Sequence, residues 1–133
     1  MYKRLTGMVI FTIIFLTFFN NTEASWERVS VETFEEEIMN NPDALLLDVR
    51  TTAEWEQDGH LEDALLIPHS DLESRSDELP EDKENLILLY CRSGNRSQEA
   101  AETLIDLGYM NIIELASGIN GWKDADKPVL YGE

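Results

Sequence analysis

A cysteine stands where an apolar run gives way to a helical pattern, and this stretch constrains the fold more than any other. The apolar run occupies residues 86–89, an amphipathic segment covers residues 98–105, and between them lies Tyr90-Cys91-Arg92-Ser93-Gly94-Asn95-Arg96-Ser97. The pattern predicts a buried strand, a tight loop and a helix, with the thiol at the end of the strand. A loop that opens a helix points backbone N–H groups inward, and these groups favour a thiolate, as do neighbouring guanidinium groups. We therefore expect Cys91 to be a nucleophilic or sulfur-carrying cysteine.

Strand and helix patterns alternate along the rest of the chain. Apolar runs that suit buried strands occupy residues 44–49, 64–67, 85–90 and 111–115. Helices are expected over residues 30–40, 70–79, 98–107 and 118–123, with a short helical turn over residues 53–56. Ser30 and either Thr51 or Thr52 are expected to cap the first helix and the turn, and Gly108 to follow the helix after the loop. The alternation predicts an α/β domain with a mainly parallel sheet, in which ligands bind at the carboxyl ends of the strands.

Charge and cysteine content exclude several classes of function. The chain has 133 residues and a formal net charge of -17, which argues against binding to nucleic acid or to anionic membrane surfaces. A single cysteine rules out an internal disulfide framework, and Cys91, His60 and His69 lack the spacing of a zinc site. We expect one domain, no metal and a monomer.

The first residues have the composition of a secretory signal. Lys3 and Arg4 precede an apolar core over residues 8–19, and the chain turns polar before Ala24, after which we expect cleavage. This divides the chain into a signal peptide, residues 1–24, and a domain, residues 25–133, exported to the periplasm or secreted. The alternative is an uncleaved anchor, which is the only membrane association that we expect. An exported thiol would enter an oxidising compartment.

Motifs in a fixed order give the chain a resemblance to a known family. They are Leu47-Asp48-Val49-Arg50, Gly59-His60-Leu61, Ala64, Ile67-Pro68, the stretch from Tyr90 to Ser97, Gly108-Tyr109 and Gly118-Ile119-Asn120-Gly121-Trp122. Together they resemble the rhodanese (sulfurtransferase) domain over residues 29–127. The family usually has glycine where Asp63 and Ser117 stand, so the shape of two loops is in question.

The resemblance implies a three-layer α/β fold with a central, mainly parallel sheet of about five strands between helices. It also implies that Cys91 forms a persulfide and moves sulfane sulfur from a donor such as thiosulfate to a thiophilic acceptor, cyanide or a thiol. A covalent persulfide needs no separate cofactor. The partners are then small sulfur compounds.

The other loop residues are expected to support this chemistry. The N–H groups of residues 92–96 would hold the persulfide, so the binding residues are Arg92, Ser93, Gly94, Asn95 and Arg96. We expect Arg92 to bind an anionic donor and Arg96 to have a mixed structural and binding role. Ser97 is interpreted as a helix N-cap, and Asp48 and Arg50 as an ion pair that braces the edge of the site. His60 is expected to stabilise a turn, and Trp55 and Trp122 to lie in the core.

Other functions remain open beside this one. A cysteine phosphatase or an arsenate reductase wraps an oxyanion with a loop that resembles Cys-x5-Arg, whereas Arg96 stands at Cys-x4-Arg and Ser97 occupies the next position. We expect the shorter loop to enclose a sulfur atom but not a phosphoryl group. A non-enzymatic persulfide carrier or a partner-binding module of the same fold is a further alternative, and a buried structural cysteine is the simplest one.

Overall fold

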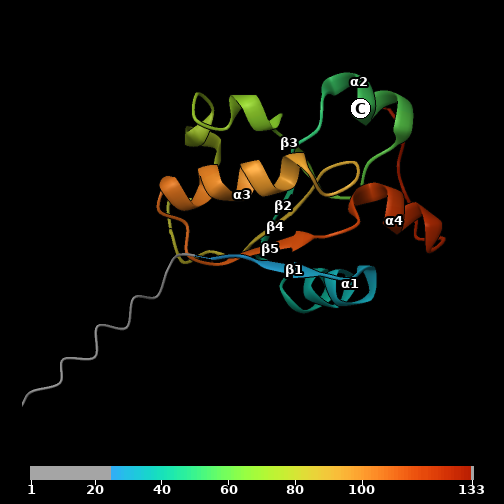
Figure 1. Cartoon of the computed structure of the whole chain (residues 1–133), viewed down its shortest axis with the longest axis horizontal. Coiled ribbons are helices and arrows are strands. Elements are labelled where there is room, and N and C mark those ends of the chain that lie inside the picture. The colour runs from blue at the N-terminus through green and yellow to red at the C-terminus, as the bar shows by residue number, and fades with distance from the viewer. Residues whose placement is uncertain (1–24, 133) are drawn as a thin grey trace, which may run out of the picture.

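A five-stranded parallel sheet forms the centre of the computed structural model, which describes residues 25–132 (Figure 1). The strand order is β1-β5-β4-β2-β3, and every neighbouring pair is parallel. The strands are β1 Glu27–Val29, β2 Leu45–Asp48, β3 Leu65–Leu66, β4 Ile87–Tyr90 and β5 Ile112–Leu115. The central strand β4 is buried along its whole length, as its unbroken apolar sequence predicts. The predicted α/β class and the parallel sheet are therefore confirmed.

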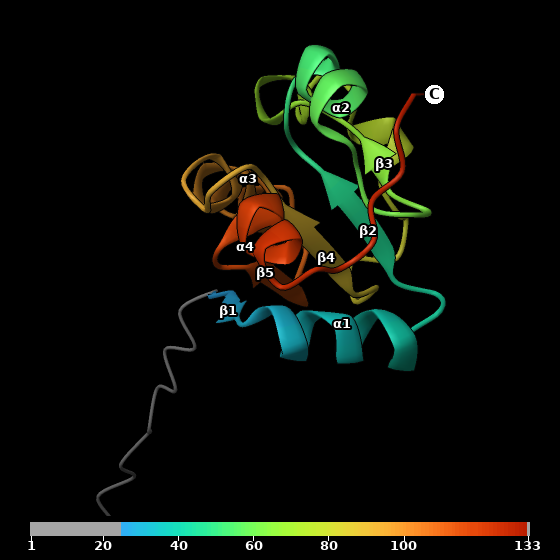
Figure 2. The same ribbon diagram turned by 90° about the vertical axis from the view of Figure 1, so that its right-hand side faces the viewer.

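Helices cover both faces of the sheet and complete the three layers. They are α1 Val31–Asn40, α2 Thr52–Asp58, α3 Arg96–Asp106 and α4 Gly118–Asp124. One face packs against α3 through Ala100, Ala101 and Leu104. The other face packs against Phe34 of α1 and Trp122 of α4, and Figure 2 shows α1 beneath the sheet. The predicted place of Trp122 in the core is confirmed.

Local signals in the sequence determine where several helices begin and end. The Ser30 side chain accepts a hydrogen bond from the Thr33 N–H at 3.3 Å and caps α1, as predicted. The Thr51 side chain does the same for the Glu54 N–H at 3.2 Å and caps α2. Gly108 follows α3 with a φ of 98°, a value that favours glycine. These capping predictions are confirmed.

The sequence predictions differ from the structure in two places. Residues 70–79 do not form one helix but two 3₁₀ turns, η1 His69–Asp71 and η2 Ser76–Glu78. Leu72 and Leu79 are buried as predicted, but the residues between them are polar, and Ser74 Oγ donates to the Asp71 carbonyl instead of supporting a helix. Strand β1 was not predicted, because it is a three-residue edge strand that begins with two charged residues.

The register of the strands brings the loop residues to one edge. Asp48 of β2 pairs with Tyr90 of β4, and Leu89 of β4 pairs with Glu114 of β5. The chain leaves all three strands just after these positions, so the loops after β2, β4 and β5 meet at the carboxyl edge of the sheet.

Within residues 25–132, no helix combines the length and the apolar character needed to cross a membrane. The predicted signal peptide lies outside the described residues.

Candidate active site

Cys91 follows β4 directly and lies at the carboxyl edge of the sheet. Its side chain is fully buried, and the Gly94 N–H donates a hydrogen bond to Sγ at 3.1 Å. Helix α3 begins at Arg96, so the chain turns from strand to helix within residues 91–95. The strand, tight loop and helix predicted from the sequence are present, and the loop closes over the thiol.

Gly94 permits this tight turn. Its φ is 93°, and a Cβ atom at this position would stand 2.1 Å from the carbonyl oxygen of Ala116. The Gly94 carbonyl in turn accepts hydrogen bonds from Arg28 Nη2 at 3.2 Å and from Gln98 Nε2 at 2.7 Å. Only glycine combines this backbone conformation with so close an approach to the next loop.

The prediction that Ser97 caps α3 is wrong. The helix begins one residue earlier, at Arg96, so Ser97 lies inside the first turn and Asn95 stands at the N-cap without a side-chain capping bond. Ser97 is instead fully buried beside Cys91. The Cys91 thiol donates to Ser97 Oγ at 3.3 Å, and the Ser97 hydroxyl donates to Glu114 Oε1 at 2.6 Å.

Glu114 of β5 is a site residue that the sequence analysis did not identify. Its carboxylate is fully buried and accepts hydrogen bonds from Trp26 Nε1 at 2.8 Å and from Arg28 Nε at 3.1 Å. One signal was available: a charged residue interrupts the apolar run Ile112–Leu115. An isolated carboxylate in a buried strand requires donors nearby, and these come from Trp26 just before β1, from β1 itself and from α3.

The loop shifts the ionisation of the thiol. Burial raises the pKa of Cys91, but hydrogen bonds from the Ser97 hydroxyl and from the N–H groups of Ser97, Gly94 and Ser93 outweigh it. The pKa of the thiol is therefore lower than its ordinary value. A lowered pKa and inward-pointing N–H groups are the properties of a nucleophilic cysteine rather than of an inert one.

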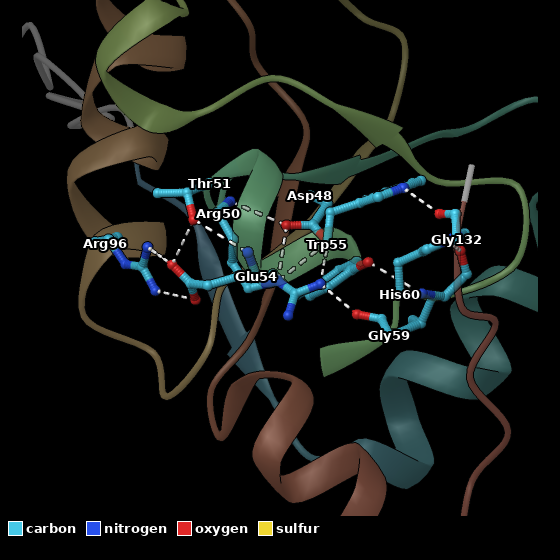
Figure 3. Close-up of polar contacts among 11 residues, drawn as sticks. Asp48, Arg50, Thr51, Glu54, Trp55, Gly59, His60, Arg96 and Gly132 are labelled. Atoms are coloured by element: carbon cyan, nitrogen blue, oxygen red, sulfur yellow. Dashed lines mark hydrogen bonds and ion pairs between the residues drawn. The ribbon is translucent and has the colours of Figure 1, made fainter. Parts of the chain in front are cut away.

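Arg96 is held by a carboxylate from another helix. Its two terminal nitrogens donate to both carboxylate oxygens of Glu54 at 2.6 and 2.8 Å, and Figure 3 shows this pair between α2 and the loop. The hydrogen bonds from Arg96 lower the pKa of Glu54 to about 2. Arg96 therefore ties the start of α3 to α2. The sequence analysis did not identify Glu54 as its partner.

Asp48 and Arg50 form the ion pair that the sequence suggested. The Arg50 Nη2 atom lies 2.7 Å from Asp48 Oδ2, and both side chains are completely buried. Arg50 Nη2 also donates to the Gly59 carbonyl at 2.6 Å, which connects the loop after β2 to the end of α2 (Figure 3). The pair lies at the carboxyl edge, where it joins two loops.

His60 and Trp55 form a stacked pair beside this edge. Their ring centroids are 3.5 Å apart with an interplanar angle of 4°. His60 Nδ1 lies 3.1 Å from the Leu61 carbonyl, a contact within the turn, as expected. The Trp55 indole is only partly buried and donates to the Gly132 carbonyl at 3.1 Å, so Trp55 holds the C-terminal segment rather than filling the core (Figure 3).

The remaining loop residues face outward. Arg92, Ser93 and Asn95 are exposed, and the Arg92 carbonyl accepts a hydrogen bond from the Asn120 N–H at 3.1 Å. The backbone is left-handed at or beside both positions where the family usually has glycine. Asp63 adopts a φ of 62°, a left-handed conformation that aspartate tolerates, and Ser117 precedes Gly118, which has a φ of 63°. Within residues 25–132, no group of three or more His, Cys, Asp or Glu side chains is arranged to hold a metal ion.

Comparisons with known proteins agree with this geometry. The sequence model of the rhodanese-like domain family matches residues 30–125 of this chain. A sulfurtransferase from Allochromatium vinosum is 34% identical over 80% of this chain and 96% of its own length. A putative sulfur carrier protein, YrkF of Bacillus subtilis, is 32% identical over 74% of this chain, which spans 52% of that protein. The crystal structure of a rhodanese-related protein from Thermoplasma volcanium, 28% identical, superposes with a TM-score of 0.69 and covers 80% of this chain and 100% of its own.

Proposed function

The chain belongs to the rhodanese-like domain family, and we propose that it transfers sulfane sulfur from thiosulfate or a related donor through a persulfide on Cys91. Sulfur transfer at the family level is supported by its sulfurtransferase relative. The observation that carries the proposal for this chain is the loop itself. The buried Sγ of Cys91 accepts a hydrogen bond from the Gly94 N–H at 3.1 Å. The loop is so tight that only glycine fits at position 94.

The proposed reaction has two displacement steps. In the first, the Cys91 thiolate attacks the outer sulfur of thiosulfate, a new S–S bond forms, the donor S–S bond breaks, and sulfite leaves with the electron pair. In the second, cyanide or a thiolate attacks the outer sulfur of the persulfide, and the Cys91 thiolate leaves. The products are thiocyanate or a persulfide on the acceptor thiol. Neither step requires a metal or another cofactor.

We propose different tasks for the two arginines of the loop. Arg92 is exposed at the mouth of the loop, and its guanidinium is suited to bind the sulfonate oxygens of an anionic donor. Arg96 already donates to both oxygens of Glu54, so its main task is to hold the loop against α2. The N–H groups of residues 92–96 hold the outer sulfur.

A non-enzymatic sulfur carrier is the second candidate function. The relationship to a putative sulfur carrier protein favours it, and a carrier would use the same persulfide but pass it to a partner protein. The two functions differ in their acceptor. An enzyme turns over repeatedly with cyanide or a small thiol, whereas a carrier loads once and releases its sulfur only to its partner.

The cysteine variant tests the proposed function. Cys91→Ser should abolish formation of thiocyanate from thiosulfate and cyanide, because serine cannot form a persulfide, while circular dichroism remains that of the wild type. Wild-type protein should turn over many times. Undiminished thiocyanate formation by the variant would refute the assignment, and a single turnover by the wild type would favour the carrier.

Loop length argues against phosphoryl transfer. Cys91 and Arg96 are separated by four residues, and we propose that this loop encloses a sulfur atom rather than a phosphoryl group.

We also propose that the mature protein is exported and monomeric. The intact mass of the mature protein checks the first point, since cleavage after Ala24 leaves Ser25 as the first residue.

A further inference from the structure

A buried carboxylate is connected to the Cys91 thiol through a single hydroxyl group. The thiol donates to Ser97 Oγ at 3.3 Å, and Ser97 donates to Glu114 Oε1 at 2.6 Å. All three side chains are fully buried, so no solvent separates them. The proposed sulfur transfer uses Cys91 and the loop N–H groups, and it assigns no task to Glu114.

The Ser97 hydroxyl cannot serve both neighbours at once as a donor. A hydroxyl has one proton to donate and two lone pairs to accept with. In the structure that proton is donated to Glu114, so Ser97 offers a lone pair to Cys91. The Ser97 hydroxyl lowers the pKa of Cys91 only when it turns to donate to the thiolate, and its bond to Glu114 holds it away from that orientation.

Hydrogen bonds from its surroundings fix the Glu114 carboxylate in place. Trp26 Nε1 donates to one oxygen at 2.8 Å, and Arg28 contacts the same oxygen through Nε at 3.1 Å. A hydrogen bond from a hydroxyl to a carboxylate is among the stronger ones in proteins, so Ser97 is held in this orientation. The negative charge of Glu114, which its ion pair with Arg28 reduces, acts in the same direction, since a like charge nearby disfavours a thiolate.

We infer that Glu114 is a positioning residue that opposes ionisation of the unloaded Cys91 by holding the Ser97 hydroxyl, and so sets the pH at which the nucleophile ionises. The inference deepens the proposed function, because it takes Cys91 as the nucleophile. The loop N–H groups favour the thiolate, as does a Ser97 hydroxyl that donates to it, and Glu114 opposes them by binding that hydroxyl. The Cys91 thiol therefore ionises at a higher pH than it would with the loop N–H groups alone.

Other charged groups surround the thiol. Arg96 begins α3, Arg92 follows Cys91 in the loop, and on β2 Asp48 and Arg50 neutralise each other as an ion pair. These groups make no contact with Glu114 and keep their partners in each variant below. Arg28 reaches the Gly94 carbonyl from β1 and is paired with Glu114, so Glu114→Gln also leaves its positive charge without that partner, which lowers the pKa of Cys91 in the same direction. The Ser97→Ala background described below separates this charge effect from the effect of the hydroxyl.

The ultraviolet absorbance of the thiolate tests the inference directly. Cys91 is the only cysteine in the chain, so the absorbance change reports this thiol alone. Glu114→Gln should lower the midpoint of the titration by about one pH unit, because the like charge disappears and Ser97 becomes free to donate to the thiolate. Glu102→Gln removes an exposed carboxylate from α3 and should leave the midpoint unchanged. An unchanged or higher midpoint in Glu114→Gln would overturn the inference.

Two further variants separate the hydroxyl from the bare charge. Glu114→Asp keeps the charge but withdraws the carboxylate by one methylene group, so it should also lower the midpoint, by less than Glu114→Gln does. It serves as the test if Glu114→Gln fails to fold. In a Ser97→Ala background, Glu114→Gln should shift the midpoint less than in the wild type. Equal shifts in both backgrounds would show that Ser97 is not involved and would overturn the coupling.

This titration is independent of the sulfur donor. It uses unloaded protein without thiosulfate, so an unchanged midpoint refutes the task of Glu114 and leaves the sulfur transfer untouched. Conversely, a lowered midpoint in a protein that never accepts sulfur would support the task of Glu114 and refute the proposed function.

Discussion

At the scale of single residues, the site depends on which guanidinium groups have carboxylate partners. Arg50 is paired with Asp48, Arg28 with Glu114, and Arg96 with Glu54. The Arg92 residue, by contrast, is exposed and directly follows Cys91. A guanidinium whose charge is already matched by a carboxylate binds a further anion weakly. We therefore propose Arg92 as the residue on which binding of an anionic donor depends most.

Arg92→Ala should raise the KM for thiosulfate about fivefold, with little change in kcat, because an exposed charge pair contributes about 1 kcal/mol. Steady-state kinetics with cyanide as acceptor measure both constants. Lys83→Ala is the matched control, since Lys83 is also exposed but precedes β4 and so lies at the opposite end of that strand. Equal KM values for wild type and Arg92→Ala would contradict the binding role.

At the same scale, alanine variants of Gly94 and Gly108 distinguish the effect of a strained backbone from the effect of a steric clash. Both have a positive φ, but a Cβ atom at Gly94 would stand 2.1 Å from the Ala116 carbonyl, whereas at Gly108 the nearest atom, in Lys83, would be 3.8 Å away. Gly108→Ala should cost about 1–2 kcal/mol of unfolding free energy and keep sulfur loading. Gly94→Ala should lose sulfur loading, because the loop must move away from Ala116.

Urea unfolding and the mass gained from thiosulfate measure these two effects for each glycine variant. If Gly94→Ala accepted sulfur at the rate of Gly108→Ala, the loop would tolerate a Cβ atom. The close approach to Ala116 would then be irrelevant to the site.

At the scale of elements, the cysteine loop is held between α2, α3, β5 and β1. Arg96 joins the start of α3 to Glu54 of α2, and α2 is in turn held by the C-terminal segment through Trp55 and Gly132 (Figure 3). Arg28 of β1 contacts the Gly94 carbonyl. The loop is therefore held by side chains from distant parts of the chain, together with the Ile119 and Asn120 N–H groups of α4, which donate to the carbonyls of Cys91 and Arg92.

The pair of Glu54 and Arg96 should make stability depend on pH in a defined window. Folding lowers the pKa of Glu54 from 4.5 to about 2, so the pair contributes fully above pH 4.5 and is lost as the pH falls toward about 2. Glu54→Gln should lower the unfolding free energy by about 1 kcal/mol at neutral pH. The difference in unfolding free energy between this variant and wild type should vanish as the pH approaches about 2.

Urea titrations at several pH values measure this difference. Glu56→Gln, an exposed change on the same helix, controls for the loss of one negative charge. A difference between wild type and Glu54→Gln that stays constant down to pH 2 would rule out the ion pair as its cause.

The sequence reveals the backbone of the site better than its side-chain partners. The apolar runs of β2, β4 and β5 and the cap of α1 follow from local patterns, and so does the position of Cys91 at the end of β4. Asp48 and Arg50 could be paired because they are two positions apart. Glu54 and Glu114 meet their partners, Arg96 and Ser97, only through the packing of helices and strands.

The same reasoning explains two of the differences between prediction and structure, the unpredicted strand β1 and the wrongly predicted cap of α3. Strand β1 has no apolar run to mark it, and it is ordered by pairing with β5 and by the contacts of Trp26 and Arg28 with Glu114. Ser97 has the composition of an N-cap, but the tight turn starts α3 at Arg96 and moves Ser97 into the first turn. Both outcomes depend on tertiary contacts that no local pattern contains.

At the scale of the whole molecule, a strongly acidic chain holds a single cysteine, the proposed nucleophile. The formal net charge of the chain is -17, and the cysteine loop contributes two of its ten basic residues, Arg92 and Arg96. The thiol itself is buried within this loop. A thiol that is buried and loaded with sulfur is protected from oxidation to a disulfide with another chain, which would suit the exported location proposed from the sequence.

The mass of the intact protein after treatment with thiosulfate tests the central claim most directly. We predict that wild-type protein gains the mass of one sulfur atom, that cyanide removes it, and that Cys91→Ser gains nothing under the same conditions. Wild-type protein that stays at its unloaded mass, or a Cys91→Ser variant that gains the same sulfur, would contradict a persulfide on Cys91.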